Sequence, residues 1–334
     1  MRDLLEELGS LRAAGVRMAM ATLVAARGGS PRPVGAKMFV GEDGRMYGSV
    51  SIGGCVDARV VAHGQRVLAG NRAEHVTVVV DDDEAIDLGL TCGAEFDLIV
   101  DPVALEGSDR VLDAYRDAAQ IARLGQRAWV VRPLDGREAP RVLTNATAAP
   151  VAVDGDAGRA YATADGRWFV DLIAPPDTLV VVGASDVALA LARIARVLGM
   201  RLVLIDGRER SVARERFAPD QVLVGMPSDL VRPHLRDGTF LVLATHDYKY
   251  ELPILREALR APLRYVGMLS GRKRAAAVRA LLRDDGVSDA DLARLHAPIG
   301  LDIGGREPED IALSIAAQLV AVREGKTIAQ RRQG

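Results

Sequence analysis

The stretch VVVGASDVALALARIARVLG, residues 180–199, decides how the second half of this sequence folds. It opens with three valines, which favour a strand, and passes through Gly183 into a run with apolar residues at helical spacing. A strand that enters a helix through a tight glycine turn is typical of a dinucleotide-binding βαβ unit. Ser185 and Asp186 stand where that pattern has a second glycine and a neutral residue. The stretch therefore predicts the fold clearly, whereas it predicts the binding of a nucleotide only weakly.

The alternation of strands and helices continues to the end of the chain. Five short apolar runs are predicted as strands: TLVVVG, RLVLID, QVLVG, TFLVLAT and LRYVGML. Helical patterns separate them, and the last amphipathic helix has Pro308 in its first turn. Strands that alternate with helices form a parallel sheet covered on both faces. We therefore predict an α/β fold with a Rossmann-like, doubly wound parallel sheet over residues 177–330.

The first half has a different rhythm and predicts a mixed α/β domain over residues 1–174. Within it, KMFVGEDGRMYGSV has the pattern of a hairpin, two apolar runs joined by a turn. Helices are predicted over residues 53–70 and from Ser108, whose side chain is typical of an N-cap. The small, Gly-rich stretch 144–160 is predicted as a surface loop, and IAPPDT as the linker between the two domains.

The composition is that of a folded protein without a bulk attraction to polyanions. Of 334 residues, 49% are hydrophobic and 26% charged, and the formal net charge is -2. The opening MRDLLEELGSLRAAG places leucines at helical spacing among charges, and it holds no apolar run long enough for a signal peptide or a membrane span. We expect a cytoplasmic protein that binds neither nucleic acid nor membranes.

Candidate binding residues follow the ends of the predicted parallel strands, because ligands bind outside the carboxyl ends of such sheets. Gly183 supplies the tight turn at the end of the first strand. Asp206, at the end of the second strand, has the position from which a carboxylate bonds a ribose hydroxyl. Arg208 lies two residues further on, placed either for a phosphate or for solvent.

Two further turns at the same predicted edge carry polar side chains. In GMLSGRKRA, the side chains of Ser270, Arg272 and Lys273 join the free N–H groups of a helix start, which is how proteins hold phosphate. A solvated helix start is the alternative there. After the fourth strand, His246 and Asp247 are placed for proton transfer or for hydrogen bonding to a heterocycle, and a structural histidine is the alternative.

The two cysteines are too few for a disulfide framework and are expected to be free thiols. Cys55 follows Gly53 and Gly54 at a predicted helix start, where unpaired N–H groups favour the reactive thiolate. Cys92 precedes a glycine in a predicted loop. A small buried apolar side chain is the alternative for both, and a two-cysteine metal site stays open although the spacing matches no recognised ligand pattern.

Together these segments resemble the XdhC/CoxI family, accessory proteins for molybdenum hydroxylases such as xanthine dehydrogenase. In the first half the resemblance lies in GGSPRPVGAKMFV, GSVSIGGCVDA and LGLTCG. In the second half it lies in VVVGASDVA, LATHDYKYELPIL, VGMLSGRKR and APIGLDIGGREPEDIALSIAAQ. The last of these is the most specific, because a generic Rossmann domain requires neither its length nor its composition.

The resemblance implies a homodimer of two-domain chains that binds molybdenum cofactor as cargo. The protein would protect the cofactor while a sulfurtransferase installs its terminal sulfido ligand, and pass it to the apo-form of a molybdenum hydroxylase. The turns at Gly183 and Ser270 would hold its phosphate or dinucleotide, and the thiolate of Cys55 would suit its soft metal. Cys55, His246 and Asp247 are the residues expected to carry chemistry.

Two other functions stay open. In an NAD(P)-dependent oxidoreductase, a divergent member of the same family, Asp206 would bind the ribose and His246 would move a proton. In a protein that only interacts with partners, the turns would be remnants without a ligand.

Overall fold

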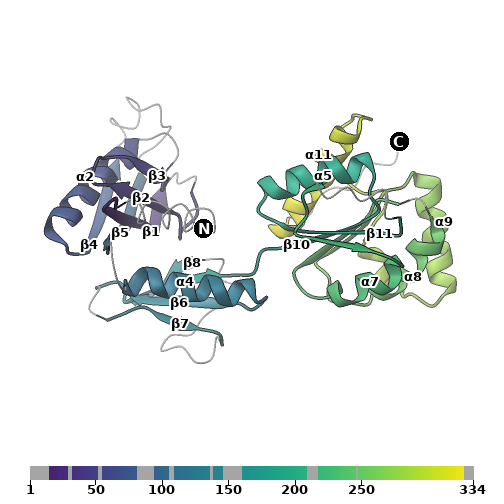
Figure 1. Ribbon diagram of the computed structural model, residues 1–334, viewed down its shortest axis with the longest axis horizontal. Helices are drawn as coiled ribbons and strands as arrows, with labels where there is room; N and C mark the ends of the chain where they lie inside the picture. Colours follow the sequence, from purple (N-terminus) through teal and green to yellow (C-terminus); the bar gives the residue numbers. More distant parts are fainter. Residues whose placement is uncertain are drawn as a thin grey trace. The chain divides into compact units, whose positions relative to one another are not determined.

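The computed structural model describes residues 15–28, 32–51, 55–80, 94–104, 109–135, 138–145, 160–208, 217–245 and 247–326. The chain divides into two compact units, Met1–Pro175 and Pro176–Gly334 (Figure 1). Each unit has its own sheets and its own apolar cores.

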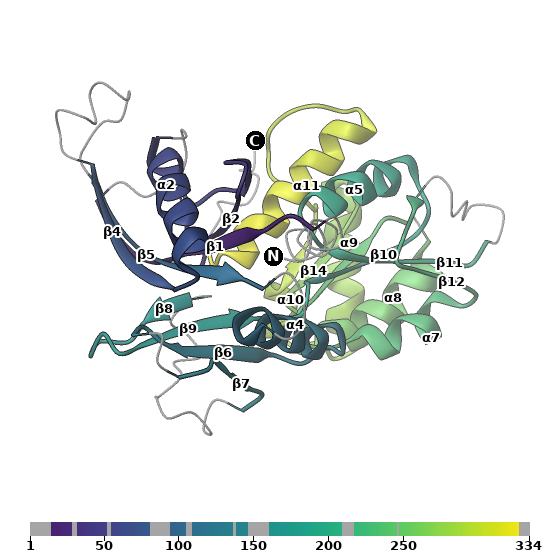
Figure 2. The ribbon, with the colours of Figure 1, turned by 60° about the vertical axis from the view of Figure 1, so that its left-hand side comes forward.

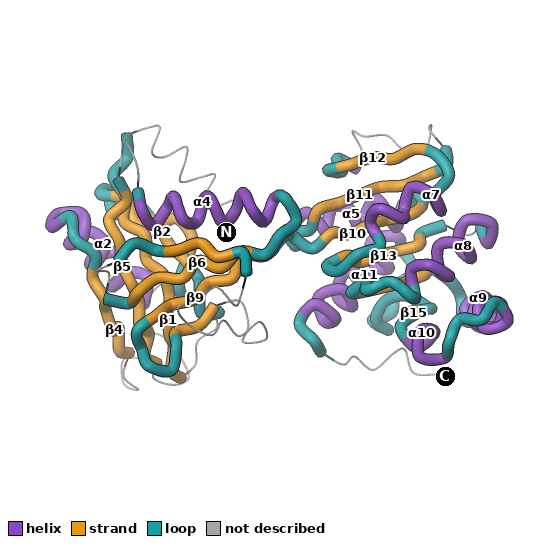
Figure 3. The backbone as a smooth tube through the Cα atoms, turned by 90° about the horizontal axis from the view of Figure 1, so that it is seen from below, coloured by secondary structure: helices purple, strands orange, loops and turns teal. Residues whose placement is uncertain are grey.

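The second unit contains a six-stranded sheet in the order β12-β11-β10-β13-β14-β15 (Figure 3). Its strands are β10 (Thr178–Val182), β11 (Arg201–Asp206), β12 (Gln221–Val224), β13 (Thr239–Leu243), β14 (Tyr265–Met268) and β15 (Leu295–His296). All neighbouring strands run parallel, which confirms the predicted doubly wound sheet. The strand order reverses between β10 and β13, and ligands of such sheets bind at that point. The sequence did not predict β15, because two residues are too few to show a periodicity.

Helices cover both faces of this sheet (Figure 1). One face packs against α5 (Asp186–Val197) and α11 (Pro308–Arg323). The other packs against α8 (Tyr248–Ala258) and α9 (Arg272–Asp284), together with the shorter α7 (Pro227–Val231) and α10 (Asp289–Ala293). Successive strand residues point to opposite faces, so both sets must be apolar, and the central strands are therefore apolar runs.

The first unit contains two antiparallel sheets (Figure 2). The five-stranded sheet, in the order β3-β2-β1-β5-β4, consists of β1 (Met18–Gly28), β2 (Lys37–Gly41), β3 (Met46–Gly48), β4 (Glu74–Val80) and β5 (Ala94–Val103). The four-stranded sheet, in the order β7-β6-β9-β8, consists of β6 (Ala128–Pro133), β7 (Arg141–Leu143), β8 (Ala160–Ala162) and β9 (Trp168–Ile173). Helix α2 (Cys55–Gly70) covers one face of the larger sheet, and α4 (Arg110–Arg123) packs on the other.

Buried charges join the two sheets of the first unit. The ammonium of Lys37, on β2, donates to Asp171 on β9, and the Tyr115 hydroxyl of α4 donates to the same carboxylate at 3.0 Å. Arg132, on β6, makes two hydrogen bonds of 2.8 and 2.9 Å to Asp101 on β5. All five side chains are buried. Burial lowers the pKa of Lys37 despite the opposing effect of Asp171, and burial followed by the charge of Asp171 raises the pKa of Tyr115 well above its ordinary value.

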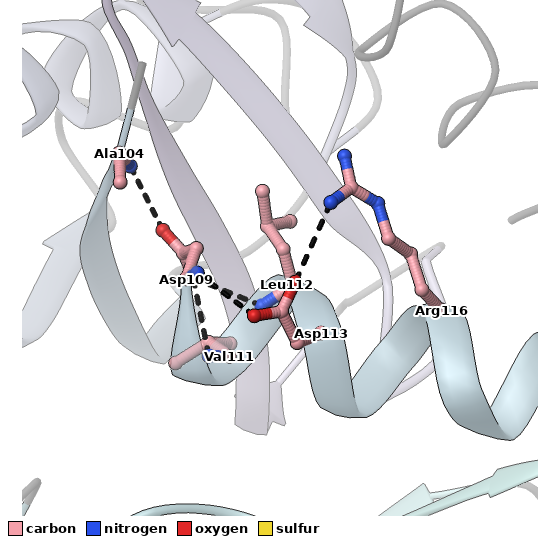
Figure 4. A network of polar contacts seen from close by, with 6 residues as sticks. All are labelled: Ala104, Asp109, Val111, Leu112, Asp113 and Arg116. Atoms are coloured by element: carbon pink, nitrogen blue, oxygen red, sulfur yellow. Dashed lines mark hydrogen bonds and ion pairs between the residues drawn. The ribbon is translucent and has the colours of Figure 1, made fainter. Parts of the chain in front are cut away.

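Two details of the first unit differ from the predictions. Helix α4 begins at Arg110, and its N-cap is Asp109, so the expectation that Ser108 begins it is wrong (Figure 4). The Asp109 carboxylate accepts hydrogen bonds from the N–H groups of Ala104, Val111 and Leu112, more than one serine hydroxyl accepts. The stretch predicted as a loop ends in β8, an edge strand too short to stand out in the sequence.

Candidate functional site

The glycine turn after β10 has the geometry that the sequence predicts. Gly183 is buried with a φ of +102°, a conformation that side-chain-bearing residues avoid. Its N–H donates to the Ile205 carbonyl at 2.8 Å. A Cβ atom added to Gly183 would lie 2.9 Å from the carbonyl oxygen of Ala244, so no larger residue fits beside the end of β13.

Ser185 and Asp186, the two departures from the dinucleotide pattern, lie at the start of α5. The Ser185 hydroxyl accepts a hydrogen bond of 3.2 Å from the Ala188 N–H and so caps the helix. Asp186 is exposed in the first turn, where a negative charge interacts favourably with the helix dipole. The Ser185 hydroxyl therefore takes one of the free N–H groups at the N-terminus of α5. The carboxylate of Asp186 would repel an anion that approaches this N-terminus.

The carboxylate of Asp206, at the end of β11, is occupied by hydrogen bonds from other groups of the protein. The side chain is 5% exposed, and its oxygens accept hydrogen bonds from the Ala184 N–H at 2.7 Å and the Arg208 N–H at 2.8 Å. The exposed guanidinium of Arg208 adds bonds of 3.2 and 3.3 Å. Burial raises the pKa of Asp206, but these hydrogen bonds outweigh it and hold the pKa below its ordinary value. A ribose hydroxyl that bonds Asp206 would have to replace Arg208.

The start of α8 lies beside the end of β11. Asp247 is the N-cap of α8 and accepts a hydrogen bond of 2.9 Å from the Lys249 N–H, which explains the aspartate in structural terms. A Cβ atom added to Gly207 would lie 3.5 Å from the hydroxyl oxygen of Tyr250, so this ring reaches the turn after β11. His246 lies outside the described residues, and its proposed part in proton transfer stays a prediction.

An ion pair between α8 and α9 is a feature that the sequence reasoning missed. Glu251 is fully buried; one carboxylate oxygen accepts from Arg274, and the other has no hydrogen-bond partner among the described residues. Burial raises the pKa of Glu251, although Arg274 opposes the effect. The guanidinium carbon of Arg274 also lies 4.6 Å from the centre of the Tyr248 ring. The sequence contains a signal for the burial of Glu251, because helical spacing places this residue on the apolar face of α8 with Ile254, Leu255 and Ala258.

In the basic turn after β14, two of the three cationic side chains are exposed and the third forms an ion pair inside the protein. The N-cap, Gly271, has no side chain to cap α9. Arg272 and Lys273 are exposed in the first turn, whereas Arg274 turns inward to Glu251. Ser270 is half-buried, and its hydroxyl is enclosed without a partner in the described ranges. Positive charge and free helix amides therefore meet solvent at this turn.

The candidate residues of the first unit are described only in part. Cys55 is the first residue of α2, as expected, but its side chain, Gly53, Gly54 and Cys92 lie outside the described residues. Asp57, which the sequence reasoning did not select, forms hydrogen bonds with residues 49–51. Its buried carboxylate accepts hydrogen bonds from the Ser49 and Ser51 hydroxyls at 2.6 and 2.9 Å, and from the N–H groups of Val50 and Ser51 at 3.3 and 3.2 Å.

The topology brings Gly183, Asp206, Asp247 and Ser270 to one edge of the parallel sheet, since each lies at or shortly after the carboxyl end of a strand. Within the described ranges, no group of three or more His, Cys, Asp or Glu side chains is placed to hold a metal ion. No helix in the described part of the chain is both long and apolar enough to cross a membrane.

Comparison with known proteins gives two family matches. Residues 179–319 match a model described as the XdhC Rossmann domain. Residues 11–80 match a model described as the XdhC and CoxI family. Each match falls within one of the two units.

Three curated relatives match parts or most of the chain. Uncharacterized protein YqeB of Escherichia coli (strain K12) is 30% identical over 175 residues, which are 52% of this chain and only 31% of YqeB. A probable xanthine dehydrogenase subunit of Bacillus subtilis (strain 168) is 25% identical over 321 residues, 91% of this chain and 93% of that protein. Molybdenum cofactor insertion chaperone PaoD of Escherichia coli (strain K12) is 27% identical over 305 residues, 91% of this chain and 83% of PaoD.

A solved structure has the same fold. The crystal structure of a xanthine dehydrogenase from Bacillus halodurans superposes with a TM-score of 0.78 at 25% sequence identity and covers 98% of both chains. The matched domains, the relatives that share nearly the whole length and this structure agree with the motifs seen in the sequence. The chain belongs to the XdhC and CoxI family.

Proposed function

We propose that this chain binds molybdenum cofactor, protects it while its terminal sulfido ligand is installed, and delivers it to a molybdenum hydroxylase. The observation that carries the proposal is the similarity over 91% of the chain to PaoD, which is named as a molybdenum cofactor insertion chaperone. The similarity to a probable xanthine dehydrogenase subunit supports a molybdenum enzyme as the partner.

The carboxyl edge of the second unit's sheet supports an anionic cargo. Arg272 and Lys273 are exposed beside the free amides of α9, and the guanidinium of Arg208 is exposed at the end of β11. Cations beside a helix N-terminus bind and orient phosphate groups. These side chains would hold the phosphate-bearing end of the cofactor.

Cys55 is the proposed thiol for the metal-bearing end. A soft thiolate suits a metal that sulfur already coordinates. Asp57, two residues after Cys55 on α2, accepts hydrogen bonds from Ser49 and Ser51, so residues 49–51 are tied to the first turn of the helix that Cys55 begins. A sulfurtransferase as sulfur donor and a homodimeric assembly belong to the same proposal and come from the family resemblance. The cytoplasmic location also belongs to it and comes from the sequence of the first residues.

A delivery experiment tests the proposal. The full chain, loaded in cells that make molybdenum cofactor, is incubated with a molybdenum-free molybdenum hydroxylase. We expect hydroxylase activity to appear in proportion to the added chain. Cys55→Ala should lower the activity gained per molybdenum transferred, and Cys92→Ala shows whether the second thiol contributes to the same step. Failure of the loaded wild-type chain under conditions where free cofactor activates the hydroxylase would contradict the proposal.

A further inference from the structure

A cavity of about 390 Å³ lies in the second unit, and Gly183 is not among the residues that line it. Its walls come from the two residues after β14, from segment 298–306, and from the first two turns of α11. Segment 298–306 belongs to APIGLDIGGREPEDIALSIAAQ, residues 297–318, the most specific motif of the sequence. The proposed function does not account for this motif.

Helix α11 holds the cavity wall in a fixed shape. The Gln318 side-chain oxygen accepts hydrogen bonds from the Gly300 N–H at 2.9 Å and from the Tyr265 hydroxyl. The Ser314 hydroxyl donates to the Leu301 carbonyl at 2.5 Å. A Cβ atom on Gly300, whose φ is +92°, would lie 2.3 Å from the Ser314 oxygen. The polar residues and this glycine of the motif therefore build the wall of a preformed cavity.

The far end of the segment leaves backbone and charge uncovered. Gly304 has a φ of +77°, and a Cβ atom added there would meet nothing within 4 Å. Gly305 is packed so closely on Asp310 that a Cβ atom would lie 2.4 Å from the aspartate Cβ. Arg306 lines the cavity, is exposed, and has no ion-pair partner among the described residues. The lining of the cavity thus includes exposed backbone at Gly304 and the exposed guanidinium of Arg306.

The lining combines apolar surface with a few polar groups. Leu269, Pro298 and Ile299 are apolar, whereas Ser270 contributes a hydroxyl that has no hydrogen-bond partner in the described part of the chain. Because the hydroxyl loses no hydrogen bond when Ser270 changes rotamer, it can turn toward a ligand without that cost. Pockets with mostly apolar walls and a few polar groups bind small organic molecules, and about 390 Å³ is near the lower end of their size range.

We propose that this cavity binds the fused heterocyclic ring of a phosphate-bearing ligand, either a purine nucleotide or a pterin. The ring lies against Leu269, Pro298 and Ile299, its polar edge meets Ser270, and its anionic part meets Arg306. A guanidinium suits this position because it bonds phosphate and also stacks on ring faces. The choice of ring rests on the proposed function, since molybdenum cofactor carries a pterin and, in its dinucleotide form, a nucleobase.

Calorimetric titration of the full chain, purified from cells that make no molybdenum cofactor, tests the assignment. The probes are guanosine monophosphate, pterin and inorganic phosphate. We expect a ring-bearing probe to bind at least about tenfold more tightly than phosphate, because burial of its apolar faces adds to the charge contact. Binding of pterin alone assigns the pterin end of the cargo to the cavity, and binding of the nucleotide assigns the nucleobase end.

Variants then locate the binding. Ser270→Ala should weaken binding of the ring-bearing probe by about two- to tenfold, the range for loss of one hydrogen bond. It should cost no stability, because the hydroxyl has no hydrogen-bond partner among the described residues. Arg306→Gln should weaken the binding of the nucleotide, and the size of this loss should depend on the salt concentration. Arg201→Gln, an exposed arginine at the amino end of β11, is the matched control and should change nothing. Photolysis with 8-azidoguanosine monophosphate should label peptides within residues 298–311.

The outcomes separate this inference from the proposed function. Binding that Ser270→Ala and Arg306→Gln both leave unchanged, or photolabel confined to other peptides, overturns the cavity assignment even when the wild-type chain delivers cofactor. Probe binding that both variants weaken, in a chain that holds no molybdenum when purified from cofactor-making cells, supports the cavity and counts against the proposed function.

Discussion

At the scale of single residues, Asp206 shows what a pattern reveals and what it leaves out. Its place at the end of β11 follows from the spacing after the glycine turn. Its hydrogen-bond partners cannot be predicted from that spacing, because the Ala184 N–H reaches the carboxylate only where Gly183 turns the chain at a positive φ. In the protein without ligand, Asp206 ties the glycine turn to the neighbouring strand.

Asp206→Asn should therefore destabilise the second unit before any ligand is added. We expect a loss of about 1–3 kcal/mol at pH 7, the usual cost when buried donors lose a charged acceptor. The pKa of Asp206 is lowered in the folded protein, so its stabilisation is complete above the unfolded value of about 3.9 and is lost as pH falls through the folded value. The difference between wild type and variant should shrink toward pH 3.

Urea unfolding followed by circular dichroism measures this effect. Both tryptophans, Trp129 and Trp168, belong to the first unit, so the loss should appear in the circular dichroism transition and leave the tryptophan fluorescence midpoint unchanged. Asp229→Asn, at an exposed carboxylate of α7, is the control for the charge change. An Asp206→Asn variant as stable as wild type at pH 7 would show that Asp206 is not the anchor of the turn.

At the scale of elements, the buried ion pair of Lys37 and Asp171 joins β2 of one sheet to β9 of the other. Charged residues are seldom fully buried unless paired, and the sequence gives no signal that residues so far apart meet. The same limit applies to Glu251 and Arg274, whose burial depends on the packing of α8 against α9. Helices and strands follow from local periodicity, whereas pairs that join elements need the tertiary structure.

Lys37→Met should destabilise the first unit by about 3–5 kcal/mol, because it leaves the carboxylate of Asp171 buried without its cation. The triple variant K37M/D171L/Y115F should recover most of this loss, since no buried charge remains without a partner. Tryptophan fluorescence during urea unfolding reports both changes. Arg45→Met, in an exposed ion pair with Asp43, should shift the midpoint little. A Lys37→Met variant within about 1 kcal/mol of wild type would contradict a structural role for the pair.

At the scale of the whole molecule, the sequence predicted the parallel sheet, its five longer strands and the family. The alternation of apolar strand runs with helical patterns in the second unit and the glycine turn were sufficient for the fold, because a sheet covered on both faces needs strands that are apolar on both faces. The cavity at segment 298–306 was not predictable, since it forms only where Gly300 packs on Ser314 and Gln318 anchors the loop. The motif is distinctive in the sequence, but its structural role depends on these tertiary contacts.

The measurement that tests the account most directly is the molybdenum and pterin content of the purified full chain. The chain is prepared from cells that make molybdenum cofactor and from matched cells that do not, and is assayed for metal and for pterin fluorescence after oxidation. We predict equal molar amounts of molybdenum and pterin in the first preparation and neither in the second. A chain from cofactor-making cells that holds neither would contradict the central claim that this protein carries the cofactor.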